Sequence, residues 1–185
     1  DEKMVSDTPM LWEPLRYLES CPSSDGACAM VITSQDQVGD RDVAWIKGMA
    51  VRSEGTLSAG RDEVNPQAGI DCAKDIYNQA GITNPYKEID CAEIYVPFSW
   101  YEPMWLENLG FCELGEGWKV TDRDATAIDG EMPFNMSGGV LSSNPIGASG
   151  MIRFGEAALQ VMGQAQDHQV ENAKVAMGHA YGGAA

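Results

Sequence analysis

The chain has 185 residues, of which 44% are hydrophobic and 22% are charged, a composition typical of one globular domain with a sizeable core. Its formal net charge is −16, which argues against nucleic acid and against anionic membrane surfaces as partners, because both attract basic proteins. No stretch has the length and apolarity of a transmembrane helix or the pattern of a signal peptide, so we expect a cytoplasmic protein.

The cysteines predict free thiols. There are five of them, with no CxxC spacing, and the two histidines do not complete a tetrahedral zinc site with them. None has the setting of a reactive nucleophile at a helix N-terminus or beside a base. We therefore expect no metal ligands and no nucleophile on this chain. The residues are Cys21, Cys28, Cys72, Cys91 and Cys112.

The first part of the chain predicts an arm followed by two strands. Residues 1–20 are polar and carry two prolines, so we expect an extended arm there and one domain over 21–185. The apolar run at 27–33 predicts a buried strand, and the β-branched and aromatic residues at 43–54 predict another. Residues 55–69 predict a loop that is either a surface excursion or part of a ligand rim.

The middle of the chain predicts two helices around a short strand. Apolar side chains recur at helical spacing over 68–81, and Gly81 is suited to end that helix. Residues 91–98 predict a strand. Ser99, followed three residues later by Glu102, has the spacing of a capping box and predicts a helix that begins there.

The last part predicts a polar loop at 114–129, a helix at 151–163, and a strand at 173–185 that runs into a glycine-rich turn. Because strands alternate with helices along the chain, the predicted fold class is an α/β layered domain.

One stretch, NMSGGVLSSNPIGASG at 135–150, is too glycine-rich for the interior of a helix or strand. It ends where the predicted helix at 151–163 begins. Free backbone N–H groups and the helix dipole favour negative charge at such a point. The stretch therefore predicts a backbone-built site for an anion or a developing oxyanion, or else a plain entry from loop to helix.

Three polar side chains stand out from apolar or glycine-rich surroundings. Asn144 precedes a proline, so it is either a turn former or an amide donor to a carbonyl oxygen. Tyr95 lies in the predicted strand, where it either packs or donates its hydroxyl. His179 lies beside a glycine at the end of the last strand, where a catalytic role and a structural one are both open.

Three other ionisable residues have less distinctive positions. His168 lies in a charged turn, and we expect it to be solvated. Glu93 and Glu102 flank Tyr95 and could act as acid or base groups, although capping and surface roles fit them better.

Four stretches occur in the order and spacing of the motifs of one enzyme family. The stretch at 135–150 resembles N-x-S-G-G followed by G-H-P-x-G-A-T-G, and residues 24–32 (SDGACAMVI) resemble S-D-G-A-A-A. Residues 91–98 lie where N-E-A-F or H-D-C-F is found, and residues 178–185 (GHAYGGAA) resemble a histidine–glycine turn. These are motifs of the C-terminal half of the thiolase superfamily, the last in its sterol-carrier type.

The resemblance implies half of a thiolase fold, with a mixed five-stranded sheet layered between helices. The complete enzyme stacks two such halves and is usually a dimer, and its N-terminal half carries the acyl-accepting cysteine. That half is expected on the same chain or on a separate one. Because both ends of this sequence look truncated, we expect the same chain.

The resemblance also implies roles for the polar residues. Asn144 stands where the family has the histidine of G-H-P, and Tyr95 stands where it has the asparagine or histidine of the second motif. Together they imply a rebuilt oxyanion hole, with His179 as the general acid/base. We expect no cofactor on this chain, coenzyme A as a substrate, and contacts between the acyl-CoA thioester and four residues. These are Ser137, Gly138, Gly147 and Gly182.

This variant pattern resembles a subgroup of thiolases and steroid side-chain aldolases that work with a small zinc-ribbon/OB-fold partner. The first functional hypothesis is cleavage or formation of a carbon–carbon bond in a β-ketoacyl-CoA by a thiolase-type acyltransferase. The second is retro-aldol cleavage of a β-hydroxyacyl-CoA. The third is a non-catalytic subunit that binds acyl-CoA or lipid, which the replacement of the G-H-P histidine favours.

Overall fold

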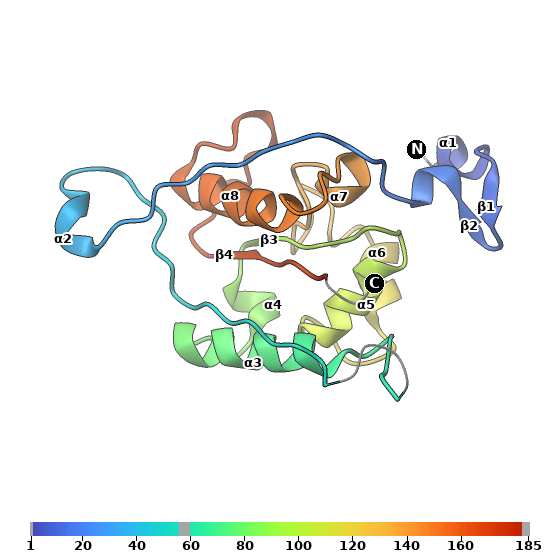
Figure 1. The fold of residues 1–185 in the computed structure, drawn as a ribbon, viewed down its shortest axis with the longest axis horizontal. Helices are drawn as coiled ribbons and strands as arrows, with labels where there is room; N and C mark the ends of the chain where they lie inside the picture. The colour runs from blue at the N-terminus through green and yellow to red at the C-terminus, as the bar shows by residue number, and fades with distance from the viewer. Residues whose placement is uncertain (1, 56–59, 183–185) are drawn as a thin grey trace.

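The computed structural model describes residues 2–55 and 60–182, and Figure 1 shows its helices and strands. The first elements are α1 (Glu2–Ser6), β1 (Met10–Trp12), β2 (Leu15–Arg16), η1 (Tyr17–Glu19), α2 (Gln35–Val38), α3 (Gln67–Ala80) and α4 (Pro85–Glu88). The others are β3 (Cys91–Glu93), α5 (Tyr101–Asn108), α6 (Gly117–Asp122), α7 (Gly139–Ser142), α8 (Ser149–Met162), η2 (Gln166–His168) and β4 (Ala176–Gly178).

The centre of the fold is the parallel pair β3 and β4, in which Ala92 lies opposite Met177. Helix α8 covers one side of this pair, and α3 and α4 lie on the other side (Figure 1). Gly178 lies so close to α8 that a Cβ there would come within 2.9 Å of the Phe154 Cα, so the close packing of strand and helix requires glycine. The α/β class predicted from the alternating pattern is confirmed, although its five-stranded sheet is not.

Two predicted helices are confirmed almost residue for residue. Helix α3 ends at Gly81, whose φ of 74° and ψ of 24° are the left-handed conformation that closes a helix. Helix α8 begins two residues earlier than predicted and ends in the same way at Gly163. Neither these nor any other helix in the described residues has the length and apolarity to cross a membrane.

The two predicted strands near the N-terminus are wrong as buried strands. Residues 27–33 and 43–54 are extended, but in the described part of the chain they pair with no other strand. They run along the helices instead (Figure 1): the backbone N–H and C=O of Met49 bond to the side chain of Gln79, both at 3.1 Å. Val31 is 95% exposed, so the burial predicted from the apolar composition of 27–33 is wrong within this chain.

The predicted strand at 91–98 is short. Its ladder ends at Glu93, although residues up to Pro97 stay half-buried or buried. Elsewhere in the described residues, strand pairing is limited to the β1–β2 hairpin and isolated bridges such as that of Ala92 with Phe134.

The cap predicted at Ser99 is wrong. The Ser99 hydroxyl donates to Glu19 Oε1 at 3.0 Å, and the carboxylate of Glu102 accepts bonds from Thr121 and Thr126. Both side chains of the predicted capping box are thus engaged across the fold, and α5 begins at Tyr101.

The predicted loop at 114–129 contains helix α6, so this expectation is also wrong. Gly117 begins the helix where a Cβ would meet the Pro103 carbonyl oxygen at 2.3 Å, and its N–H donates to Glu107 Oε1 at 2.9 Å. Val120 is then buried in the core. Tertiary contact, more than helix propensity, therefore forms this helix.

The first twenty residues hold α1, the β1–β2 hairpin and η1, so they are not extended throughout. They project to one side of the fold in Figure 1. The division into an arm at 1–20 and a domain at 21–185 stays a prediction. Parts of two other predicted segments, 56–59 of the loop at 55–69 and 183–185 of the final glycine-rich turn, lie outside the described residues.

A buried ion pair joins the strands to α8. Arg153 Nη1 lies 2.9 Å from Glu93 Oε2, and the two side chains are 5% and 0% exposed. Glu93 stands on β3 and Arg153 on α8, so the pair ties the sheet to the helix. Two opposite charges in such an apolar interior stabilise the fold only as long as both are present.

We expect Arg153→Met to lower the free energy of unfolding by about 3–5 kcal/mol, because it leaves the Glu93 carboxylate buried without its cation. Arg52→Met is the matched control, since it removes a solvent-exposed pair with Asp75. It should cost less than about 1 kcal/mol. Urea denaturation of the two variants measures the difference, and equal costs would contradict a structural role for the buried pair.

Candidate functional site

His179 lies directly after β4, in contact with three neighbouring groups. Its backbone N–H donates to the backbone carbonyl of Glu93 at 2.8 Å, and its ring Nδ1 accepts the backbone N–H of Tyr95 at 3.4 Å. The imidazole meets the Trp105 ring edge-on, with the ring centroids 4.4 Å apart. Backbone and ring contacts therefore fix the imidazole beside the strand that carries Tyr95.

The His179 imidazole is neutral at pH 7. Burial disfavours the imidazolium and lowers the pKa of His179 to about 4. A backbone N–H can only donate, so Nδ1 of the neutral ring is the acceptor for Tyr95, and this geometry assigns the ring proton to Nε2. The ring thus offers an N–H donor at Nε2.

Tyr95 takes part in this arrangement through its backbone, and its hydroxyl is not used. Its carbonyl accepts the indole N–H of Trp105 at 3.0 Å. The side chain is half-buried, and no residue in the described part of the chain hydrogen-bonds its hydroxyl. The phenol therefore keeps its full capacity to bind a ligand.

Asn144 is buried, with an exposed fraction of 2%, and its carboxamide is held at both ends. Ser149 Oγ donates to its Oδ1 at 2.6 Å, and its Nδ2 donates to the Cys21 sulfur at 3.1 Å. The amide nitrogen carries two hydrogens, so one of them remains for another acceptor.

The structure brings His179 and Tyr95 into contact, but no hydrogen bond in the described residues joins Asn144 to either of them. Asn144 approaches the pair indirectly. Its partner Cys21 donates its backbone N–H to the carbonyl of Pro97, two residues beyond Tyr95, at 2.8 Å. The catalytic roles of all three remain predictions.

Ser137, a predicted substrate contact, points its donors at protein. Its N–H and its hydroxyl both bond to the Glu93 carboxylate, at 3.0 Å and 2.8 Å, and its Oγ also accepts from Arg153 at 3.1 Å. Ser137 therefore anchors the glycine-rich stretch to the buried ion pair. Of the other predicted contacts, Gly138 and Gly147 have φ values of 90° and 95°, which favour glycine, and Gly182 is exposed.

The surface or capping role expected for Glu93 is wrong, because its side chain is fully buried. Burial raises the pKa of Glu93, while Arg153 and Ser137 oppose that rise by stabilising the carboxylate. A signal for the pair is present in the sequence: one acid in the apolar strand CAEIYV and one base in the apolar helix MIRFGEAAL.

Two more expectations concern His168 and the thiols. His168 is not simply solvated, since its Nε2 lies 3.0 Å from Glu156 Oε2. All five cysteines are free, as predicted. Burial raises the pKa of Cys91 to about 12 and that of Cys112 to about 11, so these two are thiols at pH 7 and poor nucleophiles.

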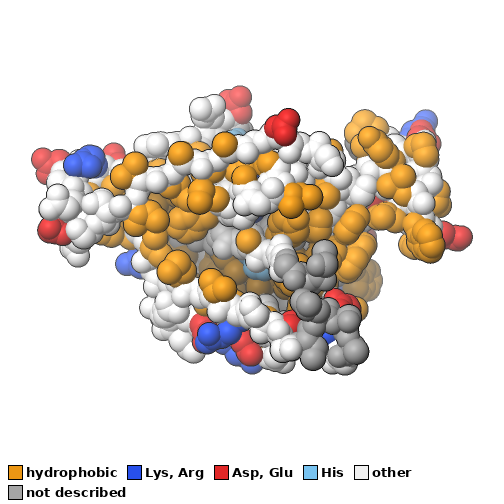
Figure 2. Space-filling model, in the orientation of Figure 1, with side chains coloured by type: hydrophobic (Ala, Val, Ile, Leu, Met, Phe, Trp, Pro, Cys, Tyr) orange, Lys and Arg blue, Asp and Glu red, His pale blue; other side chains and the backbone are white. Residues whose placement is uncertain are grey.

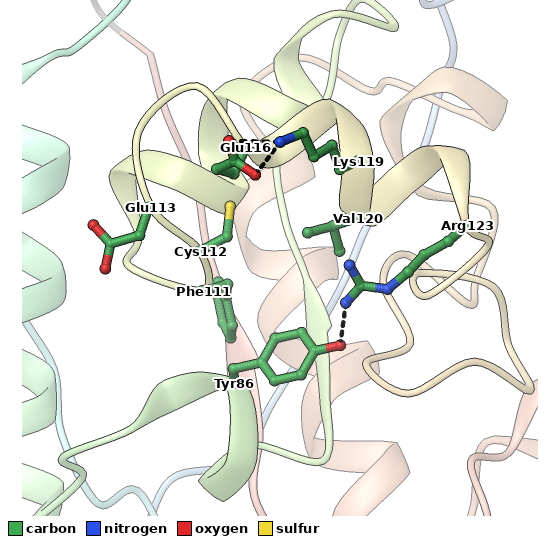
Figure 3. Close-up of a pocket in the computed structure, with 8 residues that line it drawn as sticks. All are labelled: Tyr86, Phe111, Cys112, Glu113, Glu116, Lys119, Val120 and Arg123. Carbon is green, nitrogen blue, oxygen red and sulfur yellow. Dashed lines mark hydrogen bonds and ion pairs between the residues drawn. The ribbon is translucent and has the colours of Figure 1, made fainter.

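A cavity of about 300 Å³ is lined by none of the predicted site residues. Figure 3 draws the residues that line it. Both cations of its lining already have acceptors: Lys119 lies 2.6 Å from Glu116, and Arg123 donates to the Tyr86 hydroxyl at 2.8 Å and pairs with Glu131 at 3.4 Å. Cations that are already paired leave little attraction for an anionic ligand. The lining residues are Tyr86, Phe111, Cys112, Glu113, Glu116, Lys119, Val120 and Arg123.

The family model for the thiolase C-terminal domain-like proteins matches residues 35–185. The chain belongs to this family. The resemblance of the four motifs to the thiolase superfamily is thereby confirmed.

Known relatives of this thiolase-like chain include two kinds of protein. It is 32% identical over 185 residues to an acetyl-CoA acetyltransferase of Methanothermobacter thermautotrophicus, covering 98% of this chain and 48% of that protein. It is 31% identical over 191 residues to human sterol carrier protein 2, covering 98% of this chain and 34% of that protein. The chain thus spans about half the length of the first and about a third of the second.

A solved structure described as the Ltp2-ChsH2(DUF35) aldolase has a similar fold. The TM-score is 0.80 at 25% sequence identity, and the match covers 94% of this chain and 46% of that one. The likeness of this thiolase-like chain therefore extends to both acyltransferases and an aldolase.

We expect the His179 imidazole to stay neutral from pH 5 to pH 8 and to take up a proton only as the pH falls towards about 4. NMR titration of protein labelled at imidazole Cε1 measures this, with His179→Gln identifying the signal. His168, the other histidine, gives the second imidazole signal, and its Nε2 lies 3.0 Å from Glu156 Oε2. A His179 midpoint near 6.5 would contradict the burial argument.

Proposed function

We propose that the protein carrying this chain is a thiolase-like acyltransferase that cleaves or forms a carbon–carbon bond in a β-ketoacyl-CoA. Membership of the thiolase C-terminal domain-like family supports the reaction class. The observation that carries the proposal is the fixed, neutral imidazole of His179 beside the free hydroxyl of Tyr95. A neutral imidazole is the form of histidine that can accept a proton as a general base.

In this proposal, His179 handles the proton of the α-carbon. Bond formation requires the other neutral tautomer, with the proton on Nδ1, so that Nε2 accepts the α-proton and the ring becomes an imidazolium. In bond cleavage the imidazolium returns this proton from Nε2 to the enolate carbon, and the ring is neutral again. The contact of Nδ1 with Tyr95 N–H is released when Nδ1 is protonated, and the packing on Trp105 then keeps the ring in place.

The thioester oxygen is proposed to bind the Tyr95 hydroxyl and the second N–H of Asn144. Each oxyanion donor of this kind is typically worth about 2.7–4 kcal/mol of activation free energy. Ser149 and Cys21 hold the Asn144 carboxamide, so this donor is already oriented before substrate binds. Coenzyme A is a substrate in this scheme, and Gly138, Gly147 and Gly182 allow its close approach.

The nucleophilic cysteine is proposed to come from an N-terminal half, because the described thiols with raised pKa values are poor nucleophiles. The exposed apolar residues of 27–33 and 43–54 support packing of such a half on this face. Figure 2 shows apolar side chains spread over the face along which these residues run, and again at the N-terminal hairpin. A dimer of complete subunits and a small zinc-ribbon/OB-fold partner belong to the same proposal.

Retro-aldol cleavage of a β-hydroxyacyl-CoA is the second candidate function. The similar fold of the Ltp2-ChsH2(DUF35) aldolase favours it, and the DUF35 component named in that aldolase supports a DUF35-type partner here. This reaction also needs an acid/base at the α-carbon and an oxyanion hole, but it needs no cysteine. The C-terminal half serves both reactions equally, so a substrate panel separates them.

We expect His179→Ala to lower kcat by about 100-fold or more in the complete protein, because it removes the acid/base group. His168→Ala is the matched control and should leave kcat unchanged, since His168 pairs with Glu156 away from the site. Thiolysis of β-ketoacyl-CoA and retro-aldol cleavage of β-hydroxyacyl-CoA are assayed side by side with purified complex. Retained activity in His179→Ala would contradict the assignment, and no activity on either substrate class in wild type would favour a non-catalytic subunit.

Tyr95→Phe removes only the hydroxyl and should lower kcat by about 100-fold, because one oxyanion donor is lost. The backbone N–H that holds His179 is unchanged by this substitution. The imidazole signal of His179 should therefore keep its titration behaviour while kcat falls. An unchanged kcat would contradict this role and indicate that the Tyr95 side chain only packs in the fold.

A further inference from the structure

Arg61 is a nearly buried cation beside the aromatic side chains of the site. Its side chain is 4% exposed, and its Nη2 donates to the hydroxyl of Tyr181. The guanidinium carbon lies 5.7 Å from the centroid of the Tyr181 ring, within reach of a cation–π contact. These contacts hold the charge in place but do not neutralise it.

The charge of Arg61 is incompletely paired. Its Nε is buried and has no hydrogen-bond partner among the residues that the structure describes. The nearest carboxylate oxygen, Glu63 Oε2, is 3.7 Å from Nε, beyond hydrogen-bonding distance, and the Glu63 side chain is 62% exposed. A buried donor of a charged group that lacks an acceptor is costly, so an anion that fills this position would bind favourably.

The turn that directly follows Arg61 is held by hydrogen bonds. Asp62 Oδ1 accepts the N–H groups of Val64 and Asn65, at 2.9 Å and 2.8 Å. The carbonyl of Val64 accepts the side-chain amide of Asn108 on α5 at 2.8 Å. Arg61 is thus presented from a fixed turn, as a binding group should be.

Arg61 is connected to His179 through aromatic rings. Tyr181 follows His179 by two residues, and its ring meets that of Trp105 at a centroid distance of 5.2 Å. Trp105 in turn meets the His179 ring at 4.4 Å. Tyr181 and Trp105 thus place the Arg61 guanidinium two aromatic rings away from the candidate acid/base.

We propose that Arg61 binds an oxyanion group of the thioester substrate, either a carboxylate at the far end of the acyl chain or a phosphate of coenzyme A. The edge of a guanidinium matches both groups, because its N–H donors bind two oxygens at once. Glu63 then competes with the ligand and moves aside towards solvent when the ligand binds. The inference takes the thioester from the proposed function, but it concerns binding and needs no turnover.

The test is equilibrium binding of inert analogues to the complete protein by titration calorimetry. S-(3-carboxypropyl)-CoA and S-butyl-CoA carry the same number of carbons on sulfur and differ by a terminal carboxylate, and both are thioethers that cannot transfer an acyl group. S-butylpantetheine lacks the phosphates of coenzyme A. The variants are Arg61→Met, Arg61→Lys and, as the matched control, Glu63→Gln.

If the anion is an acyl carboxylate, wild type binds the carboxylated analogue at least about fivefold more tightly than S-butyl-CoA, and Arg61→Met abolishes that preference. If the anion is a phosphate, Arg61→Met weakens both CoA analogues by at least about fivefold and leaves S-butylpantetheine unchanged. In both cases Arg61→Lys binds more weakly than wild type, because an ammonium group lacks the paired N–H donors of a guanidinium edge. Glu63→Gln binds at least as tightly as wild type because it removes a competing carboxylate.

The proposal is overturned if Arg61→Met binds all three analogues within about twofold of wild type, or if Glu63→Gln weakens binding, which would make Glu63 the structural partner of Arg61. Should Arg61→Met fail to fold, Arg61→Lys and Glu63→Gln decide by the same criteria. If wild type shows no turnover but its binding of the analogues depends on Arg61, only the proposed reaction is rejected. If wild type turns over substrate but its binding of the analogues does not depend on Arg61, only the role of Arg61 is rejected.

Discussion

The ion pair between Glu93 and Arg153 is the interaction on which the rest of the structure depends. The Glu93 side chain binds Arg153 of α8 and both donors of Ser137, while its backbone carbonyl accepts the N–H of His179. One residue thus joins the central strands, the long helix, the glycine-rich stretch and the candidate acid/base. Because both charges lie in an apolar interior, neither can be removed without leaving the other unpaired. The geometry of the candidate site and the stability of the domain are therefore coupled.

The site that results has two parts of different character. His179 and Tyr95 are in direct contact and are fixed by backbone hydrogen bonds and by the Trp105 ring. Asn144 is held separately, between Ser149 and Cys21. The proposed oxyanion hole requires the thioester oxygen to bind the Tyr95 hydroxyl and the Asn144 amide together. In the proposed function, Asn144 in place of the family's G-H-P histidine keeps a hydrogen-bond donor but carries no positive charge.

The sequence predicted the parts of the fold whose signals are local. Helix α8 and its closing glycine follow from helical spacing and from the left-handed turn that Gly163 permits. The prediction of a strand at 27–33 failed because an apolar run does not indicate which segment it packs against. In the described residues it pairs with no strand. Glu93 and Arg61 escaped prediction for the same reason: each owes its role to residues distant in the sequence, Arg153 and Tyr181. The family motifs located His179 and Tyr95, but only the structure shows them in contact.

The central claim is that His179 moves a proton at the α-carbon of an acyl-CoA. The most direct measurement is exchange of the α-protons of a saturated acyl-CoA with D₂O, followed by proton NMR in the presence of the complete protein. The account predicts exchange with wild type and none above background with His179→Ala, while calorimetry shows that the thioester still binds. Equal exchange by both proteins would contradict it, because the proton would then be moved by another group.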